Sequence, residues 1–220
     1  GLLLSFLVLK KTNTGLMFEA KGGIARWVKN PDADLPNWNT EDLNWPAAPA
    51  GVTLGIGAIL KENGFVHYYA PVEPGNHNIY VVRWKETDIV AGDLSKGEWF
   101  GSDGWSTDAG KSEPVVEGLQ TEFSVDRTSD GDFLMVSTRG FGGADVVGRR
   151  APKPEGPWSD AELLFHPPES DRPGVLIYSA KAHPEIKGGQ LAITYCSNHV
   201  DFNTLLDDLT LYFPHFLRPQ

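Results

Sequence analysis

The chain has 220 residues, which is long enough for one large domain or two small ones with a buried core. Its formal charge of −10, from 19 Lys and Arg against 29 Asp and Glu, excludes the basic surface that nucleic acids and anionic membranes attract. A single cysteine, Cys196, excludes an internal disulfide framework, and no run of 18 apolar residues could span a membrane.

The first eleven residues, GLLLSFLVLKK, are the only stretch with any likeness to a signal peptide. The basic residues follow the apolar run instead of preceding it, and no A-x-A cleavage pattern is present. We therefore interpret this stretch as a buried β-strand. Since the sequence also has no N-x-S/T sequon, the compartment of the protein stays open, with secretion as one option.

Short runs rich in Val, Ile, Phe, Tyr and Thr alternate with glycines and prolines, which predicts an all-β chain. The turns KENG, TSDG and IKGG supply the residues that tight hairpins need. In chain order, the expected strands are Leu2 to Lys10, Ile24 to Val28, Leu54 to Leu60, Phe65 to Pro71, Asn78 to Trp84, Glu122 to Arg127, Phe133 to Arg139, Asp145 to Arg150, Tyr178 to His183, Gln190 to Cys196 and Thr210 to Leu217.

A repeat of four strands emerges when these runs are stacked. Each unit has a strand, a Gly turn, a nearly continuous apolar strand, a strand ending in Arg, and a last short strand. This pattern predicts a single β-propeller domain of the five-bladed type, with about four blades here and the N-terminal part missing. The alternative is a β-sandwich with coincidental spacing. The blade-like units are residues 1–46, 51–107, 112–166 and 174–220.

The innermost strand of each blade lines the channel of a propeller, and this predicts where chemistry lies. The runs QTEFSVDRT and IYSAKAHPEI place Glu122, Tyr178, Lys181 and His183 near the axis. Glu122 is our candidate general acid, and its plain alternative is a strand-end carboxylate facing solvent. Pro184 holds His183 extended, as a ligand contact or as a core histidine. No cofactor or metal motif is present, although His183 could bind an ion on the axis.

Further substrate contacts are predicted on loops and aromatic side chains. Trp99 and Trp105 flank a Gly-rich loop and could stack on sugar rings, whereas a Trp that recurs in each blade is also typical of a core. His67 lies on a strand next to two tyrosines. The run RGFGGAD, from Arg139 to Asp145, opens no helix and suits a pocket loop better than a phosphate loop.

Several segments resemble a known family. EFSV, GDFLMVST, PEGPWSDAELLF, YSAKAHPEI, GGQLAITYCSN and LYFPHFL are similar to the C-terminal half of five-bladed propeller proteins allied to glycoside hydrolase family 43. They resemble more closely the uncharacterised domain family numbered 4185. The resemblance covers Gly51 to Arg218 and implies an acid at the place of Glu122. The catalytic base that it also implies cannot be carried over, because the first inner strand has no counterpart in this sequence.

Three functions follow as hypotheses. The first is a glycoside-hydrolase-like propeller that acts on a polysaccharide through an axial acid-base site. The second is a noncatalytic carbohydrate-binding propeller, which the missing partner carboxylate favours, and the third is a protein-interaction propeller. A carbohydrate is the expected ligand in the first two cases, and neither nucleic acid nor membrane is expected as a partner.

Overall fold

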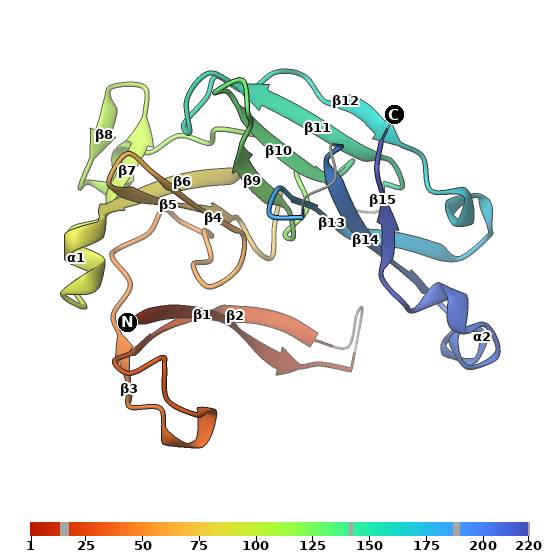
Figure 1. Cartoon of the computed structure of the whole chain (residues 1–220), viewed down its shortest axis with the longest axis horizontal. Helices are drawn as coiled ribbons and strands as arrows, with labels where there is room; N and C mark the ends of the chain where they lie inside the picture. The colour runs from red at the N-terminus through yellow and green to blue at the C-terminus, as the bar shows by residue number, and fades with distance from the viewer. Residues whose placement is uncertain (14–17, 141–142, 187–189, 220) are drawn as a thin grey trace. The chain divides into compact units, whose positions relative to one another are not determined.

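The structure is a computed structural model that describes residues 1–13, 18–140, 143–186 and 190–219 (Figure 1). The chain is all-β, with 44% of its residues in strands, and the described residues form several small antiparallel sheets and two short helices. It divides into two compact units, residues 1–117 (unit 1) and residues 118–220 (unit 2). Neither helix in the described part of the chain has the length and apolarity needed to cross a membrane.

Unit 1 contains two sheets, with strand orders β1-β2-β3 and β4-β5-β6-β7-β8. In both sheets, strands that follow one another in the chain are neighbours, as the short loops between them require. The element bounds are β1 (Leu2–Lys11), β2 (Phe18–Val28), η1 (Leu35–Asn37), β3 (Thr40–Leu43), β4 (Ala58–Glu62), β5 (Phe65–Pro71), β6 (Ile79–Lys85), α1 (Glu86–Val90), β7 (Glu98–Gly101), β8 (Gly104–Ser106) and η2 (Ala109–Lys111).

The first predicted strand is confirmed as β1, but the prediction that it is buried is wrong. Phe6, Val8 and Leu9 are exposed, and much of the strand is only partly covered. The physical reason is position, because within the described part of the chain β1 is an edge strand of its sheet and pairs only with β2. Its apolar sequence alone did not reveal that it lacks a neighbour on one side.

The hairpin between β4 and β5 forms as its sequence predicts. Asn63 and Gly64 occupy the turn with φ of 50° and 79°, the left-handed pair of a two-residue type I′ connection. β5 lies between β4 and β6 and is buried over most of its length. The TSDG turn is also present, with Gly131 at a φ of 96°, whereas Lys187 to Gly189 of the IKGG turn lie outside the described residues.

Unit 2 also contains two sheets, with orders β12-β11-β10-β9 and β13-β14-β15. The bounds are β9 (Ser124–Arg127), β10 (Phe133–Thr138), β11 (Val146–Ala151), β12 (Glu162–Phe165), η3 (Pro168–Asp171), β13 (Val175–His183), β14 (Ala192–His199), α2 (Phe202–Asp207), η4 (Leu209–Leu211) and β15 (His215–Leu217). The core of unit 2 packs β10 and the start of β11 against β13 and β14, through buried aliphatic side chains such as Val136, Ile177 and Ile193.

The last predicted strand is shorter than expected. The sequence predicts a strand over Thr210 to Leu217, but only His215 to Leu217 pairs with β14. The carboxylate of Asp208 accepts a hydrogen bond from the backbone N–H of Thr210, and this cap favours the 3-10 turn η4 over an extended chain. Local side-chain bonding therefore overrides the apolar pattern here.

The four sheets fall within the four ranges predicted as blade-like units. The apolar middle strand β10 is buried at every position, as expected for a strand covered on both faces. The arrangement of the sheets as blades of one domain stays a prediction.

Candidate functional site

A β-bulge in β13 decides which of its side chains point together. Tyr178 pairs with Cys196 and Lys181 pairs with Thr194, so between these pairs two residues of β13 face one residue of β14. Ser179, inside the bulge, has a φ of 57°, which is uncommon for a residue with a side chain. Residues three apart point to opposite faces of a regular strand, and the extra residue brings Tyr178 and Lys181 back to one face.

Polar side chains line one face of this strand pair, while the opposite face packs into the core of unit 2. Along β14, the buried Ile193 and Tyr195 alternate with half-buried polar positions. We define the β13–β14 face as the residues Tyr178, Lys181, His183, Thr194, Cys196 and Asn198. Three of the site residues predicted from the sequence lie on this face.

Glu122 lies beside this face. It is half-buried and precedes β9 by two residues. Burial raises the pKa of the Cys196 thiol, the Glu122 carboxylate adds to the rise, and Lys181 opposes it. Burial likewise raises the pKa of Tyr178, and negative charge at Cys196 and Glu122 raises it further. The structure thus brings Glu122, Tyr178 and Lys181 within electrostatic reach of one thiol.

His183 is held from both sides of its ring. Its Nδ1 lies 3.0 Å from the Oε1 of Glu185, and its Nε2 lies 2.8 Å from the Oγ1 of Thr194. A ring fixed in this way can present a constant surface to a ligand, but both nitrogens are already engaged. Within the described ranges, no group of three or more His, Cys, Asp and Glu side chains is placed to hold a metal ion.

Asp126 is a candidate that the sequence analysis missed. Its Oδ2 is buried and has no hydrogen-bond partner, and burial raises the pKa of its carboxyl group. A hydrogen bond from Ser124 opposes that rise, and the charges of Glu185 and His183 act on the same group. The E-x-S-x-D pattern of residues 122–126 could have revealed it, because alternate strand positions share one face.

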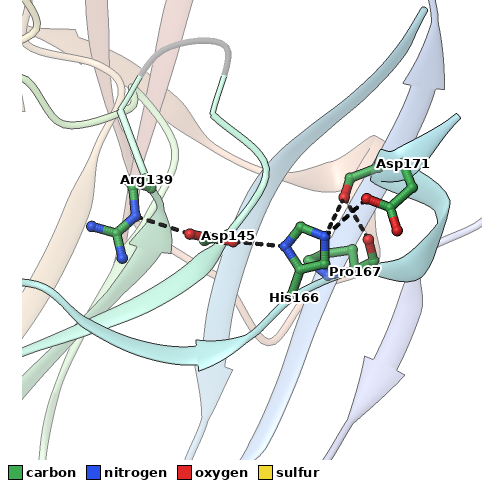
Figure 2. Close-up of polar contacts among 6 residues, drawn as sticks. Arg139, Asp145, His166, Pro167 and Asp171 are labelled. Atoms are coloured by element: carbon green, nitrogen blue, oxygen red, sulfur yellow. Dashed lines mark hydrogen bonds and ion pairs between the residues drawn. The ribbon is translucent and has the colours of Figure 1, made fainter. Parts of the chain in front are cut away.

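A second polar cluster in unit 2 contains two more of the predicted residues, Arg139 and Asp145 (Figure 2). Arg139 Nε donates to Asp145 Oδ2 at 3.1 Å, and the backbone N–H of Arg139 bonds the Asp145 carbonyl at 2.8 Å. His166 Nδ1 lies 2.8 Å from Asp145 Oδ1. The bond to His166 lowers the pKa of Asp145, while bonds to Asp145 and Asp171 raise the pKa of His166.

Ser170 completes the cluster in the order acid, imidazole, hydroxyl that serine hydrolases use. Its Oγ lies 3.2 Å from His166 Nε2, but it donates to the Pro167 carbonyl at 2.6 Å. Asp171 Oδ1 lies 3.3 Å from the same imidazole nitrogen. Because carboxylates at both ring nitrogens favour the imidazolium, His166 is poorly suited to be a base. We interpret this cluster as a structural link between the start of β11 and η3.

Two predicted contacts, His67 and Trp105, meet in unit 1. His67 is only 4% exposed, and burial lowers its pKa to about 4, so its imidazole is neutral at physiological pH. Its ring centroid lies 5.7 Å from that of Trp105. The Arg83 guanidinium lies 4.1 Å from the Trp105 ring and 4.3 Å from the Phe65 ring, so it covers one face of each. The geometry describes a packed stack in which one face of Trp105 is already occupied.

Trp99 lies in the core of unit 1. It is 1% exposed, and its Nε1 donates to the carbonyl of Ala47 at 2.9 Å. A ring buried on both faces cannot stack on a sugar without unfolding its surroundings, so the structure favours the alternative interpretation of Trp99 as a core residue. The cause is its place on β7, an inner strand between β6 and β8.

Two solved structures resemble the fold. A "putative hydrolase" from Bacteroides ovatus aligns with 98% of this chain and 57% of its own, at a TM-score of 0.72 and 20% identity. A glycoside hydrolase family 43 arabinoxylan arabinofuranohydrolase from Bacillus subtilis, in complex with cellotetraose, aligns with 97% of this chain and 46% of its own, at a TM-score of 0.54 and 15% identity. These identities establish similarity of fold alone, and the chain spans about half the length of either structure.

The likeness to family 43 predicted from the sequence is thus confirmed at the level of the fold. The finer likeness to the family numbered 4185 stays a prediction. No curated protein matches the chain in sequence. A family model does match residues 6–220, nearly the whole chain, and the chain therefore belongs to DUF5005, a domain of unknown function.

Proposed function

We propose that this chain is part of a glycoside-hydrolase-like β-propeller that binds a polysaccharide at the β13–β14 face, with Glu122 as the general acid. The observation that carries the proposal is the gathering of Glu122, Tyr178 and Lys181 around Cys196. The sequence predicts all three as channel-facing residues. The complex of the family 43 neighbour with cellotetraose supports a carbohydrate as the class of ligand.

The proposed chemistry is protonation of the glycosidic oxygen. A general acid must donate a proton to the leaving oxygen, and Glu122 is the carboxyl group beside the β13–β14 face that we assign to this step. Tyr178, Lys181 and His183 would contact sugar hydroxyls, since they offer donors on one face of β13. Arg139 and Asp145, also predicted as contacts from the sequence, bond each other and His166, and we assign them no part in binding the glycan.

Asp126 does not supply the partner carboxylate. Four strand residues span about 13 Å, whereas retaining enzymes separate their two carboxyl groups by about 5 Å and inverting enzymes by about 6.5–9.5 Å. Glu122 and Asp126 are four residues apart in the chain. We therefore assign Asp126 no part in bond cleavage, and the base is not among the residues we assign.

The proposed architecture treats the four sheets as blades of a five-bladed propeller. Each sheet is an antiparallel array of strands consecutive in the chain, as in a propeller blade, and the similar fold of the family 43 enzyme supports the same reading. An experimental structure that shows the four sheets arranged around one axis would test it. A face-to-face packing of two sheets would instead support the sandwich.

The first experiment is release of reducing sugars from a panel of plant and microbial polysaccharides. Wild type should release sugar, and Glu122→Gln should lose release while retaining its far-UV spectrum and unfolding midpoint. Glu162→Gln, which changes an exposed carboxylate on β12, is the matched control and should release sugar like wild type. Release by a folded Glu122→Gln variant would refute the assigned role of Glu122.

A noncatalytic carbohydrate-binding propeller is the second candidate, and the spacing between Glu122 and Asp126 favours it. Binding of a polysaccharide without release of sugar, in both wild type and Glu122→Gln, would support this second function. A protein-interaction propeller is a third candidate, to which the exposed Phe202, Leu206 and Phe213 at the C-terminal end of unit 2 are relevant. Failure to bind any polysaccharide would refute the first two functions and favour this third one.

A further inference from the structure

A row of three residues crosses the C-terminal sheet of unit 2. Thr194 on β14 pairs with Lys181 on β13 and with Phe216 on β15. Directly paired residues of neighbouring antiparallel strands point to the same side of a sheet. Phe216 therefore extends the β13–β14 face onto β15, the strand that runs beside β14 in Figure 1.

Phe216 is an aromatic side chain that is largely in water. It is 55% exposed, although β15 is paired along its length with β14. The Arg218 guanidinium carbon lies 5.5 Å from the centre of its ring. Tyr212 is also exposed and lies close enough to Tyr178 for its charge to act on that residue. Exposed aromatic rings thus adjoin polar side chains on one face.

We infer that Phe216 is a stacking platform for the apolar face of a sugar ring, in a neutral glycan that crosses the sheet from Glu122 to β15. This inference rests on the proposed function of the β13–β14 face. An aromatic ring that packs on the C–H groups of a sugar buries apolar surface, while nearby hydroxyl, amide and ammonium groups satisfy the sugar hydroxyls. Phe216 supplies the aromatic ring, and Lys181 and Asn198 supply the polar groups for the sugar hydroxyls.

The geometry specifies the length and the charge of the ligand. Neighbouring strands lie about 4.8 Å apart, so β13 and β15 are separated by roughly 10 Å. A ligand that reaches from β13 to Phe216 on β15 must be an oligosaccharide and not a single sugar. The net charge of −10 disfavours an anionic polysaccharide, and this makes the expected glycan neutral.

The test is titration calorimetry of the full chain with cellotetraose, xylotetraose and the corresponding monosaccharides. We expect a tetrasaccharide to bind and the monosaccharides to bind far more weakly. Phe216→Ala should weaken binding of the tetrasaccharide roughly three- to tenfold, the value of a lost aromatic contact, and Phe216→Trp should retain it. Phe202→Ala is the matched control, because Phe202 is 68% exposed on α2, an element outside the sheet of β13, β14 and β15.

Three outcomes decide between the inference and the function on which it rests. If Lys181→Ala weakens tetrasaccharide binding but Phe216→Ala does not, the platform is refuted and the proposed function stands. If wild type binds neither of the two tetrasaccharides and none of the polysaccharides, the platform and the proposed function are both refuted. A change in mass on sedimentation for Phe216→Ala, with unchanged glycan binding, would refute the platform by showing that Phe216 covers a protein contact.

Discussion

Tyr178 and Lys181 point to the same face of β13, although three positions separate them along the chain. The bulge at Ser179 creates this relationship, and it is stabilised because both residues keep regular pairs on β14. A strand without the bulge would turn Lys181 toward the apolar core that Ile177 and Ile193 share. The proposed site therefore depends on one backbone irregularity.

The first prediction concerns that irregularity. Ser179→Val should lower the free energy of unfolding by about 1–2 kcal/mol relative to Ser179→Gly, because a branched side chain resists a φ of 57° and glycine does not. Urea unfolding of both variants measures the difference. Equal unfolding midpoints would show that the backbone of the bulge can adopt another conformation without strain.

The second prediction concerns the buried carboxyl of Asp126. Because burial raises its pKa above the ordinary 3.8, folding favours the protonated form. Its contribution to stability is present below about pH 4 and is lost as the pH rises through the folded-state value. Asp126→Asn should therefore be more stable relative to wild type at pH 7 than at pH 4. Thermal unfolding at both values tests this, with exposed Asp132→Asn as control.

The third prediction concerns His166. Its hydrogen bonds to Asp145 and Asp171 raise its pKa above the ordinary 6.5, so the bonds stabilise the fold below about pH 6.5 and less as the pH rises through the raised value. An NMR titration of the imidazole protons should show a raised His166 pKa in wild type. The His166 pKa should be lower in the Asp145→Asn variant than in wild type. Asp160→Asn, outside the cluster, should leave it unchanged. A His166 that titrates at 6.5 in all three proteins would contradict the cluster.

The fourth prediction separates the two tryptophans. Trp99→Ala should cost about 3–5 kcal/mol of unfolding free energy, because it empties a fully buried site and leaves the Ala47 carbonyl without its donor. Trp105→Ala should cost less, since Trp105 is half-buried, although it loses the Arg83 contact, worth about 1 kcal/mol, and its ring contacts with His67 and Phe100. Denaturant unfolding followed by circular dichroism compares them, and equal losses would contradict the burial difference.

The all-β class, the order of most strands and several turns are predictable from the sequence alone. Hydrophobic runs set apart by glycines and prolines are local signals, and the Asn63–Gly64 turn formed because its φ requirement is local as well. The strand repeat also predicts that Tyr178 and His183 share one strand, and both lie on β13. Glu122 is predicted as a site residue from its position at the start of a predicted strand.

Which of those residues meet, and which are covered, depends on how the strands pack and pair in three dimensions. Exposure of β1 and burial of Trp99 depend on whether a neighbouring strand is present, and no local pattern carries that information. The raised pKa of Asp126 arises from desolvation by the packed strands around it. The row from Lys181 to Phe216 depends on strand register, which pairs residues 35 positions apart in the chain only after β13, β14 and β15 have folded into one sheet.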